Sequence, residues 1–394
     1  MAKLVVYQMW APSWKNMEEM TAHLYRIARL GVTHVWLSGA LASPWYDHGY
    51  DVSDYCRINL RFATDGDADA EFAKFIATAD KLGICVVIDL VLNHTSTEHP
   101  WFQGHPEYYC WEKQPREGWG NLFDGGSAYK YDAERQMYYL HLFHPKQADL
   151  KWFVDGKVNL SLVAEFKKIV RFWKERGVDG FRLDVPQAIN KDLSRDKLSF
   201  EDLLRGRRDQ EVLNAVFEDE EKMFLMMECF DPTFGQLAKR YATETPVDFV
   251  MNALMKGAIS AGEKEFLELV YQFERSPGAM INFEDHDGPR FTSSSGLSPA
   301  RALFHLFNSQ SQAICLYQGQ ELGLYNPSWL SSQRICELDA QAAMQMARGV
   351  EVDRSLVRAN ARMPLNIVEY EWQMRDFDSC YRYTQHLIAR FYRL

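Results

Sequence analysis

The chain has 394 residues, of which 47% are hydrophobic and 25% charged, so it can bury a large core. Its formal net charge of -10 argues against nucleic acid or an anionic membrane as a partner. The seven cysteines show no metal-binding spacing, and the N-terminus has neither a signal-peptide pattern nor a long apolar span. Together these features predict a cytoplasmic protein from a reducing compartment.

Strand-like and helix-like segments alternate from the N-terminus onwards, which is typical of parallel βα units. The expected strands cover residues 4–10, 33–37, 84–92, 179–185, 223–228, 247–251, 279–283 and 313–317. The expected helices cover residues 17–30, 69–82, 161–176, 201–221 and 379–393. Eight strands in this order predict an α/β fold, a (β/α)8 TIM barrel.

One segment interrupts the alternation after the third expected strand. Residues 95–158 are rich in Trp, Tyr, Gly and His and are too long for a simple loop. We expect them to form a small subdomain inserted into the barrel. The predicted division is therefore residues 1–94 for the first part of the barrel, 95–158 for the inserted subdomain, and 159–394 for the remainder.

The fourth expected strand has the sequence G-F-R-L-D-V at residues 180–185. Arg182 and Asp184 are two residues apart, so on a strand both side chains point to one face. A guanidinium beside a carboxylate favours the ionised form, and an ionised Asp at a barrel mouth suits covalent catalysis at a sugar carbon. Taken alone, the pair favours the alternative of a structural ion pair that closes a strand.

Three further strands end in polar residues, at the positions where barrel enzymes place their chemistry. The third ends in D-L-V-L-N-H at residues 89–94, and the fifth ends in Glu228 after a run of apolar residues. The seventh runs into N-F-E-D-H-D at residues 282–287. Each segment has a plain structural alternative, such as a loop histidine or a solvent-facing glutamate. In combination they indicate a catalytic site.

Together with G-Y-D at residues 49–51, these motifs resemble the α-amylase superfamily, glycoside hydrolase family 13, over nearly the whole chain. The resemblance is greatest to the branch of oligo-1,6-glucosidases, dextran glucosidases and α-glucosidases, and it includes residues 123–150. It implies a retaining mechanism with Asp184 as the nucleophile and Glu228 as the general acid/base. Asp287 would be the third carboxylate, which stabilises the positively charged sugar.

The resemblance also implies a set of sugar-binding residues and a small α-glucoside or oligosaccharide as the substrate. The implied residues are Tyr50, Asp51, His94, Arg182, His286 and Arg290. Asp51 would bind hydroxyls at the non-reducing end, and Arg290 would lie at the rim. In the resembling branch, Val at the position of Val185 accompanies α-1,6 linkages, so these are slightly favoured over α-1,4.

Several segments depart from the family pattern. Residues 11–16 lack the acidic calcium loop of many relatives, so we expect no metal and no other cofactor. Asp285 stands where the family usually has Asn. The expected last helix ends the chain, with no C-terminal β-sandwich domain. We therefore expect a homo-oligomer to cover the corresponding face of the barrel, which light scattering can test.

Three functional hypotheses remain open at this stage. The first is an α-glucosidase-type hydrolase acting on short α-glucosides. The second is a transglycosylase, sugar isomerase or phosphorylase on the same framework, because the same carboxylates serve these reactions. The third is an inactive amylase-like binding protein, against which the retained carboxylates argue.

Overall fold

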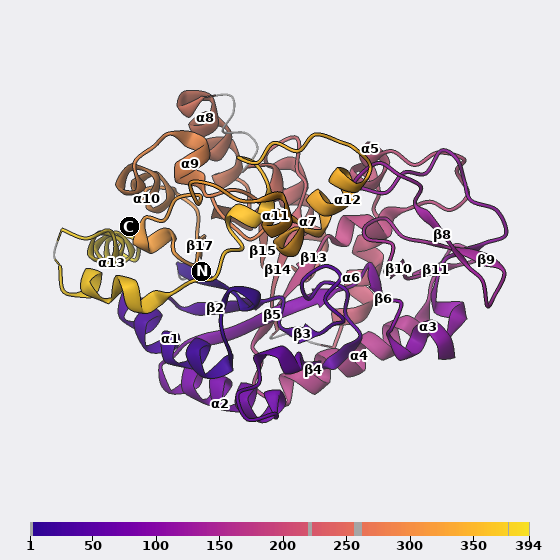
Figure 1. Cartoon of the computed structure of the whole chain (residues 1–394), viewed down its shortest axis with the longest axis horizontal. Coiled ribbons are helices and arrows are strands. Elements are labelled where there is room, and N and C mark those ends of the chain that lie inside the picture. Colours follow the sequence, from indigo (N-terminus) through magenta and orange to yellow (C-terminus); the bar gives the residue numbers. More distant parts are fainter. Residues whose placement is uncertain (1–2, 220–222, 256–261, 377, 394) are drawn as a thin grey trace.

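Eight parallel strands form a closed barrel in the computed structural model, which describes residues 3–219, 223–255, 262–376 and 378–393 (Figure 1). The order around the barrel is β1-β17-β16-β15-β14-β13-β5-β2. The barrel closes where β1 pairs with β17, with Leu4 opposite Ala313, and with β2, with Val6 opposite His34. The predicted (β/α)8 fold class is confirmed.

The barrel strands lie at or next to the expected positions. They are β1 (Leu4–Trp10), β2 (His34–Ser38), β5 (Cys85–Val91), β13 (Gly180–Asp184), β14 (Phe224–Cys229), β15 (Phe249–Asn252), β16 (Ala279–Asn282) and β17 (Ala313–Tyr317). Their residues are almost all buried, because one face of each strand fills the barrel and the other packs under helices. Trp36, Met226 and Met280 belong to the apolar cluster inside the barrel.

Helices cover the outside of the barrel. The principal ones are α1 (Met17–Leu30), α2 (Ala68–Lys81), α4 (Leu160–Lys174), α6 (Arg208–Phe217), α7 (Gln236–Glu244), α8 (Glu263–Glu274), α10 (Pro299–Phe307) and α13 (Cys380–Phe391). Local sequence sets their ends: the Asn16 side chain caps α1 through the Glu19 amide, and Gly31 ends it at φ 94°.

The helix expected over residues 201–221 is two helices, α5 (Phe200–Arg205) and α6. Gly206 separates them in an extended conformation, and a Cβ there would lie 2.4 Å from the Asn190 Cβ. The Asn190 side chain accepts a hydrogen bond from the Asp209 amide at the start of α6. This close approach divides the segment, and the last two expected helical residues, 220 and 221, lie outside the described residues.

Short strands and one helix fill the long connection between β5 and α4. They are β6 (His94–Ser96), α3 (Pro100–Gly104), β7 (Trp111–Glu112), β8 (Tyr129–Asp132), β9 (Met137–Leu140), β10 (Gln147–Asp149), β11 (Phe153–Val154) and β12 (Lys157–Val158). They pair only with one another, in three small sheets. In Figure 1, β8, β9, β11 and α3 lie together to the right of the barrel.

A second long connection, between β17 and α13, holds elements that the sequence did not predict. They are α11 (Ser332–Leu338), α12 (Ala340–Ala347) and the 3-10 turns Gln320–Leu322, Arg358–Asn360 and Ile367–Met374. None of the helices in the described part of the chain is both long enough and apolar enough to cross a membrane.

Candidate active site

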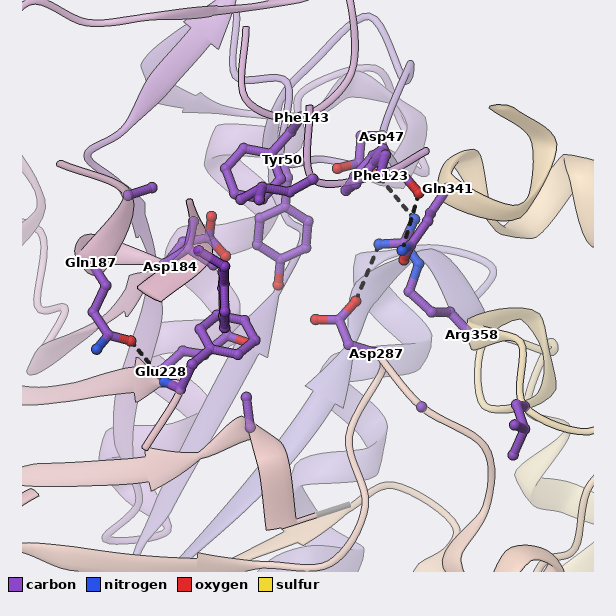
Figure 2. A pocket seen from close by; sticks show the side chains of 18 of the residues that line it. Asp47, Tyr50, Phe123, Phe143, Asp184, Gln187, Glu228, Asp287, Gln341 and Arg358 are labelled. Carbon is purple, nitrogen blue, oxygen red and sulfur yellow. Dashed lines mark hydrogen bonds and ion pairs between the residues drawn. The ribbon is translucent and has the colours of Figure 1, made fainter. Parts of the chain in front are cut away.

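A cavity of about 940 Å³ opens at the carboxyl ends of the barrel strands. Asp184, Glu228 and Asp287 all line it, together with Tyr50 and His94 (Figure 2). The register pairs Leu183 of β13 with Met227 of β14, so the next residues, Asp184 and Glu228, come at one level on neighbouring strands. The fold thus brings the three predicted catalytic carboxylates together.

One guanidinium connects two of these carboxylates from behind the cavity wall. Arg182 is 2% exposed, and it donates from Nη1 to Asp184 Oδ1 at 2.5 Å and from Nη2 to Glu228 Oε2 at 2.7 Å. Burial raises the pKa of Asp184, and the Arg182 guanidinium opposes this rise because it favours the ionised carboxylate. Arg182 therefore aligns both groups and favours the ionised form of Asp184 against the effect of burial.

Asp287 approaches the cavity from the loop after β16. Its Oδ1 accepts hydrogen bonds from Arg362 Nη2 at 2.8 Å and Arg358 Nη1 at 3.3 Å. Its backbone N–H donates to Asp285 Oδ1 at 2.8 Å. Asp285 occupies the position where the resembling family usually has Asn. Its carboxylate thus fixes the backbone of Asp287.

His286 lies in a stack of aromatic rings beneath the cavity. Its ring centroid is 4.4 Å from that of Trp10 and 5.2 Å from that of Tyr50, with nearly parallel planes. Gln8 Nε2 lies 2.8 Å from Nδ1, so this nitrogen accepts and Nε2 carries the hydrogen, and Nε2 lies 3.1 Å from Asp287 Oδ2. His286 is thus a support for Tyr50 and Asp287 and does not itself line the cavity.

His94 lines the cavity at the end of β5. Its Nε2 lies 3.2 Å from the Tyr50 carbonyl oxygen, and its Nδ1 lies 3.2 Å from Asn93 Nδ2. Burial, with a smaller contribution from Lys191, lowers the pKa of His94 to about 3. The ring is therefore neutral near pH 7 and adds no charge to the cavity.

Two predicted sugar-binding residues lie behind the cavity wall and not at its surface. The Asp51 carboxylate accepts hydrogen bonds from Ser43 Oγ at 2.8 Å and from the amides of Tyr46 and Asp47 at 2.8 and 2.9 Å, so it shapes its own loop. Arg290 donates to Glu284 Oε2 at 3.1 Å and to a backbone carbonyl at 2.7 Å. Neither is among the cavity-lining residues.

The sequence analysis missed Asp47 and Arg358, which both line the cavity. Arg358 Nη2 lies 3.5 Å from Asp47 Oδ1, and Arg358 also contacts Asp287. Asp47 was detectable as a second acidic residue in the loop of the G-Y-D motif. Arg358 had no comparable signal, because it lies in a connection for which no element was predicted.

The connection between β5 and α4 and the connection between β17 and α13 meet beside the cavity. The Phe123 carbonyl oxygen accepts hydrogen bonds from Gln345 Nε2 at 2.9 Å and Gln341 Nε2 at 3.4 Å, both on α12. Arg348 Nη1 donates to the Asp124 carbonyl oxygen at 3.0 Å. Figure 2 shows Phe123, Gln341 and Arg358 on the side of the cavity opposite Gln187 and Glu228. These contacts join the two connections on that side of the cavity.

Potential metal ligands occur at one place among the described residues. One ligand atom each of Asp285, His286 and Asp287 lies within 4.8 Å of the others. However, Asp287 already faces the guanidinium groups of Arg358 and Arg362, and His286 Nδ1 faces Gln8. A cation would have to compete with two positive groups, so this arrangement favours an anchored carboxylate over a metal site.

A closed parallel barrel with carboxylates at its strand ends defines a (β/α)8-barrel protein with a site of the glycosidase type. Residues 13–366 match the family described as "Alpha amylase, catalytic domain". The chain therefore belongs to the α-amylase family.

Similar curated proteins and structures come from the same family. Trehalose-6-phosphate hydrolase of Escherichia coli K12 is 31% identical over 372 residues, which span 82% of this chain and 65% of that protein. Glucan 1,6-alpha-glucosidase of Streptococcus pneumoniae is 28% identical over 410 residues, 92% of this chain and 74% of that protein. The crystal structure of Bacillus licheniformis trehalose-6-phosphate hydrolase superposes with a TM-score of 0.82 at 25% identity, covering 100% of this chain and 84% of that one.

Proposed function

We propose that this protein is a retaining α-glucosidase-type glycoside hydrolase that acts on short α-glucosides. The observation that carries the proposal is the Arg182 guanidinium, which bonds both Asp184 and Glu228 at the edge of one cavity. Carboxylates that share one guanidinium are close neighbours, and a retaining glycosidase needs its pair about 5 Å apart. The names of the relatives, which are hydrolases and glucosidases, support the same class.

The reaction proceeds in two displacements. A carboxylate oxygen of Asp184 attacks the anomeric carbon while Glu228 donates its proton to the departing glycosidic oxygen, which leaves a β-glycosyl ester on Asp184. Glu228, now ionised, takes a proton from an incoming water, and the water oxygen displaces Asp184 from the anomeric carbon. Arg182 lowers the cost of negative charge on both carboxylates at the moments when each is ionised.

The glucosyl unit occupies the part of the cavity around Asp287, Tyr50, His94 and Asp47. Asp287, held by two arginines, stabilises the positive charge that develops on the ring. Tyr50, supported by the His286 and Trp10 rings, provides a flat apolar surface for one face of the sugar. Asp47, paired with Arg358, takes the sugar-binding role predicted for Asp51.

The cavity wall supports an exo-acting enzyme. Residues 95–158, which we propose as a subdomain inserted between residues 1–94 and 159–394, contribute Phe123 and Asp124 to a wall completed by α12. A wall on this side hinders the passage of a long glucan, whereas the end of a short glucoside can enter. Among sugar linkages, Val185 beside the nucleophile favours α-1,6 over α-1,4.

A product screen tests this proposal. We expect the purified protein to release glucose from at least one of isomaltose, maltose, trehalose and sucrose, or from a synthetic α-glucoside. Asp184→Asn should reduce this release by at least about a thousandfold because the nucleophile is lost. The matched control, Asp196→Asn on the exposed surface, should leave it unchanged.

The same screen separates the alternatives. Each incubation is repeated with phosphate and with an excess of unlabelled sugar, and products are resolved by chromatography. Sugar phosphate or new glucosides in place of glucose would replace the hydrolase with a phosphorylase or transglycosylase. Equal activity of the Asp184→Asn variant would contradict the proposed mechanism.

A further inference from the structure

The cavity has two chemically different halves. Asp47, His94, Asp287 and Arg358 come from the connections after β2, β5, β16 and β17 and make one half polar and charged. The other half lies over the consecutive strands β13, β14 and β15. Its lining side chains are apolar apart from Gln187, and the apolar ones are Val185, Ala188, Phe200, Leu203, Leu204, Phe230 and Ala253. Asp184 and Glu228 lie between the two halves, so the apolar half adjoins the bond that is broken.

Packing and a hydrogen bond hold the residues of the apolar half in place. Leu203 and Leu204 of α5 are 2% and 8% exposed, and the Leu203 carbonyl oxygen accepts a hydrogen bond from Asn190 Nδ2 at 2.8 Å. The Phe200 and Phe230 rings meet edge to face with centroids 5.4 Å apart. These contacts fix the apolar surface in place next to the catalytic carboxylates.

Apart from Tyr50 Oη and Gln187 Nε2, which have no hydrogen-bond partner among the described residues, the neutral polar side chains that line the cavity already make hydrogen bonds within the protein. Gln187 Oε1 accepts from the Phe230 amide at 2.7 Å, and Ser293 Oγ accepts from the Asn326 amide at 2.7 Å. Asn326 Nδ2 donates to the Ser355 carbonyl at 3.2 Å. Ser294 Oγ donates to the Arg290 carbonyl oxygen, and Gln341 Nε2 donates to that of Phe123. Ser355 Oγ donates to Asp353 Oδ1. Few groups remain to replace the water around the hydroxyls of a second sugar.

The charges of the cavity also disfavour a phosphorylated leaving group. Among the described lining residues, Arg358 is the single Lys or Arg side chain. It already makes ion pairs with Asp47, Asp287 and Asp339. A phosphate in the apolar half would find no positive charge among these residues. It would also lie near the carboxylates of Asp184, Glu228 and Asp287.

We infer that the group released from glucose is apolar, an alkyl or aryl alcohol, and not a second sugar or a sugar phosphate. This inference rests on the proposed glucosidase function and specifies its substrate class. An alkyl or aryl group gains free energy by leaving water for the apolar half, whereas a sugar ring there loses hydrogen bonds that the wall does not replace.

A homologous series of alkyl α-glucosides tests the inference. Methyl, butyl, hexyl and octyl α-glucosides have leaving alcohols of nearly equal acidity, so their kcat/KM values differ mainly through binding of the chain. We expect kcat/KM to rise by about fourfold for each methylene that enters the apolar half. Hexyl α-glucoside should also exceed isomaltose and trehalose 6-phosphate. A flat series, with isomaltose preferred, would overturn the inference.

Variants of the wall provide the matched comparison. Phe200→Ser and Leu204→Asn should flatten the chain-length series, mainly through higher KM values for hexyl and octyl α-glucosides. Leu160→Ser, an exposed leucine at the start of α4 outside the cavity, is the control and should retain the full series. An unchanged series in the wall variants would contradict the assignment.

A binding measurement separates this inference from the proposed function. Calorimetric titration of Asp184→Asn with methyl and hexyl α-glucosides needs no turnover. Tighter binding of the hexyl compound by at least about tenfold supports the apolar half even if the native protein releases no glucose, which would contradict the proposed function alone. Equal binding of both compounds overturns the inference even if glucose is released.

Discussion

Asp47 and Asp51 lie four residues apart in one loop and have different roles. Asp51 is fully buried and accepts three hydrogen bonds from its own loop, two of them from backbone amides. Asp47 lines the cavity and pairs with Arg358. Burial raises the pKa of Asp47 to about 6, although Arg358 attracts its ionised form. The residue type is the same, and the direction of the side chain decides its role.

Substituting the two aspartates should therefore separate activity from stability. We expect Asp47→Asn to lower kcat/KM by roughly ten- to a hundredfold, since a charged hydrogen bond to a sugar hydroxyl contributes about 1.5–3 kcal/mol. Asp51→Asn should lower the free energy of unfolding by about 1–3 kcal/mol, because its amide cannot accept all three hydrogen bonds. Glucose release and urea unfolding of both variants measure this. The opposite pattern would restore Asp51 as the sugar-binding residue.

At the scale of elements, α12 has a function that its own sequence does not reveal. It is a short helix remote from β13 and β14, yet Gln341, Gln345 and Arg348 reach across to the carbonyl oxygens of Phe123 and Asp124. Phe123 in turn lies over Arg358, with the guanidinium carbon 5.1 Å from the ring centroid. The helix therefore supports the wall next to the glucosyl half of the cavity.

Removing the hydrogen bonds from Gln345 and Arg348 to the Phe123 and Asp124 carbonyl oxygens should weaken substrate binding more than catalysis. For the double variant Gln345→Ala and Arg348→Ala we expect KM to rise by about fivefold, the equivalent of one lost hydrogen bond, with kcat within about twofold. Relative activity on longer oligosaccharides should increase because the wall is opened. Arg334→Ala, whose ion pair with Glu337 lies within exposed α11, is the control. Unchanged KM and chain-length preference would show that α12 does not close the cavity.

At the scale of the whole molecule, contacts between the two ends of the chain complete the barrel layer. The last strand, β17, pairs with β1, and α13 packs beside α1. Tyr381 Oη donates to the Arg26 carbonyl oxygen at 2.9 Å, and Tyr392 Oη donates to that of Gly31 at 2.7 Å. Ile388 is 1% exposed within this contact. These contacts lie on the outer layer, away from the cavity-lining residues.

A substitution that leaves an empty space at this contact should lower the stability of the protein without changing its catalytic activity. We expect Ile388→Ala to lower the free energy of unfolding by about 2–4 kcal/mol, as a buried large-to-small substitution does. Leu160→Ala, at an exposed leucine, should change it by less than about 0.5 kcal/mol. Urea unfolding measures both, and kcat per folded molecule should be unchanged. A parallel loss of kcat would show that the outer layer and the site are coupled.

Much of the fold was predictable because its signals are local. Apolar runs of strand length and amphipathic runs of helix length placed the strands 4–10 and 313–317 and the helix 17–30 at the residues where they occur. The helix 201–221 was not predicted correctly, since its division depends on contact between Gly206 and the distant Asn190. The elements between β17 and α13 were also missed, because their short helices pack against loops and lack a strong period of their own.

By itself, the sequence determined the barrel and the motifs that place Asp184, Glu228, Asp287, Tyr50 and His94 at the cavity. These depend on periodicity and on strand ends, which are properties of neighbouring residues. Only the tertiary structure decided that Asp47 and not Asp51 faces the cavity, that Arg358 joins it, and that α5 and Phe230 make half of it apolar. The physical reason is that side-chain direction and long-range contact arise when segments far apart in the chain pack together.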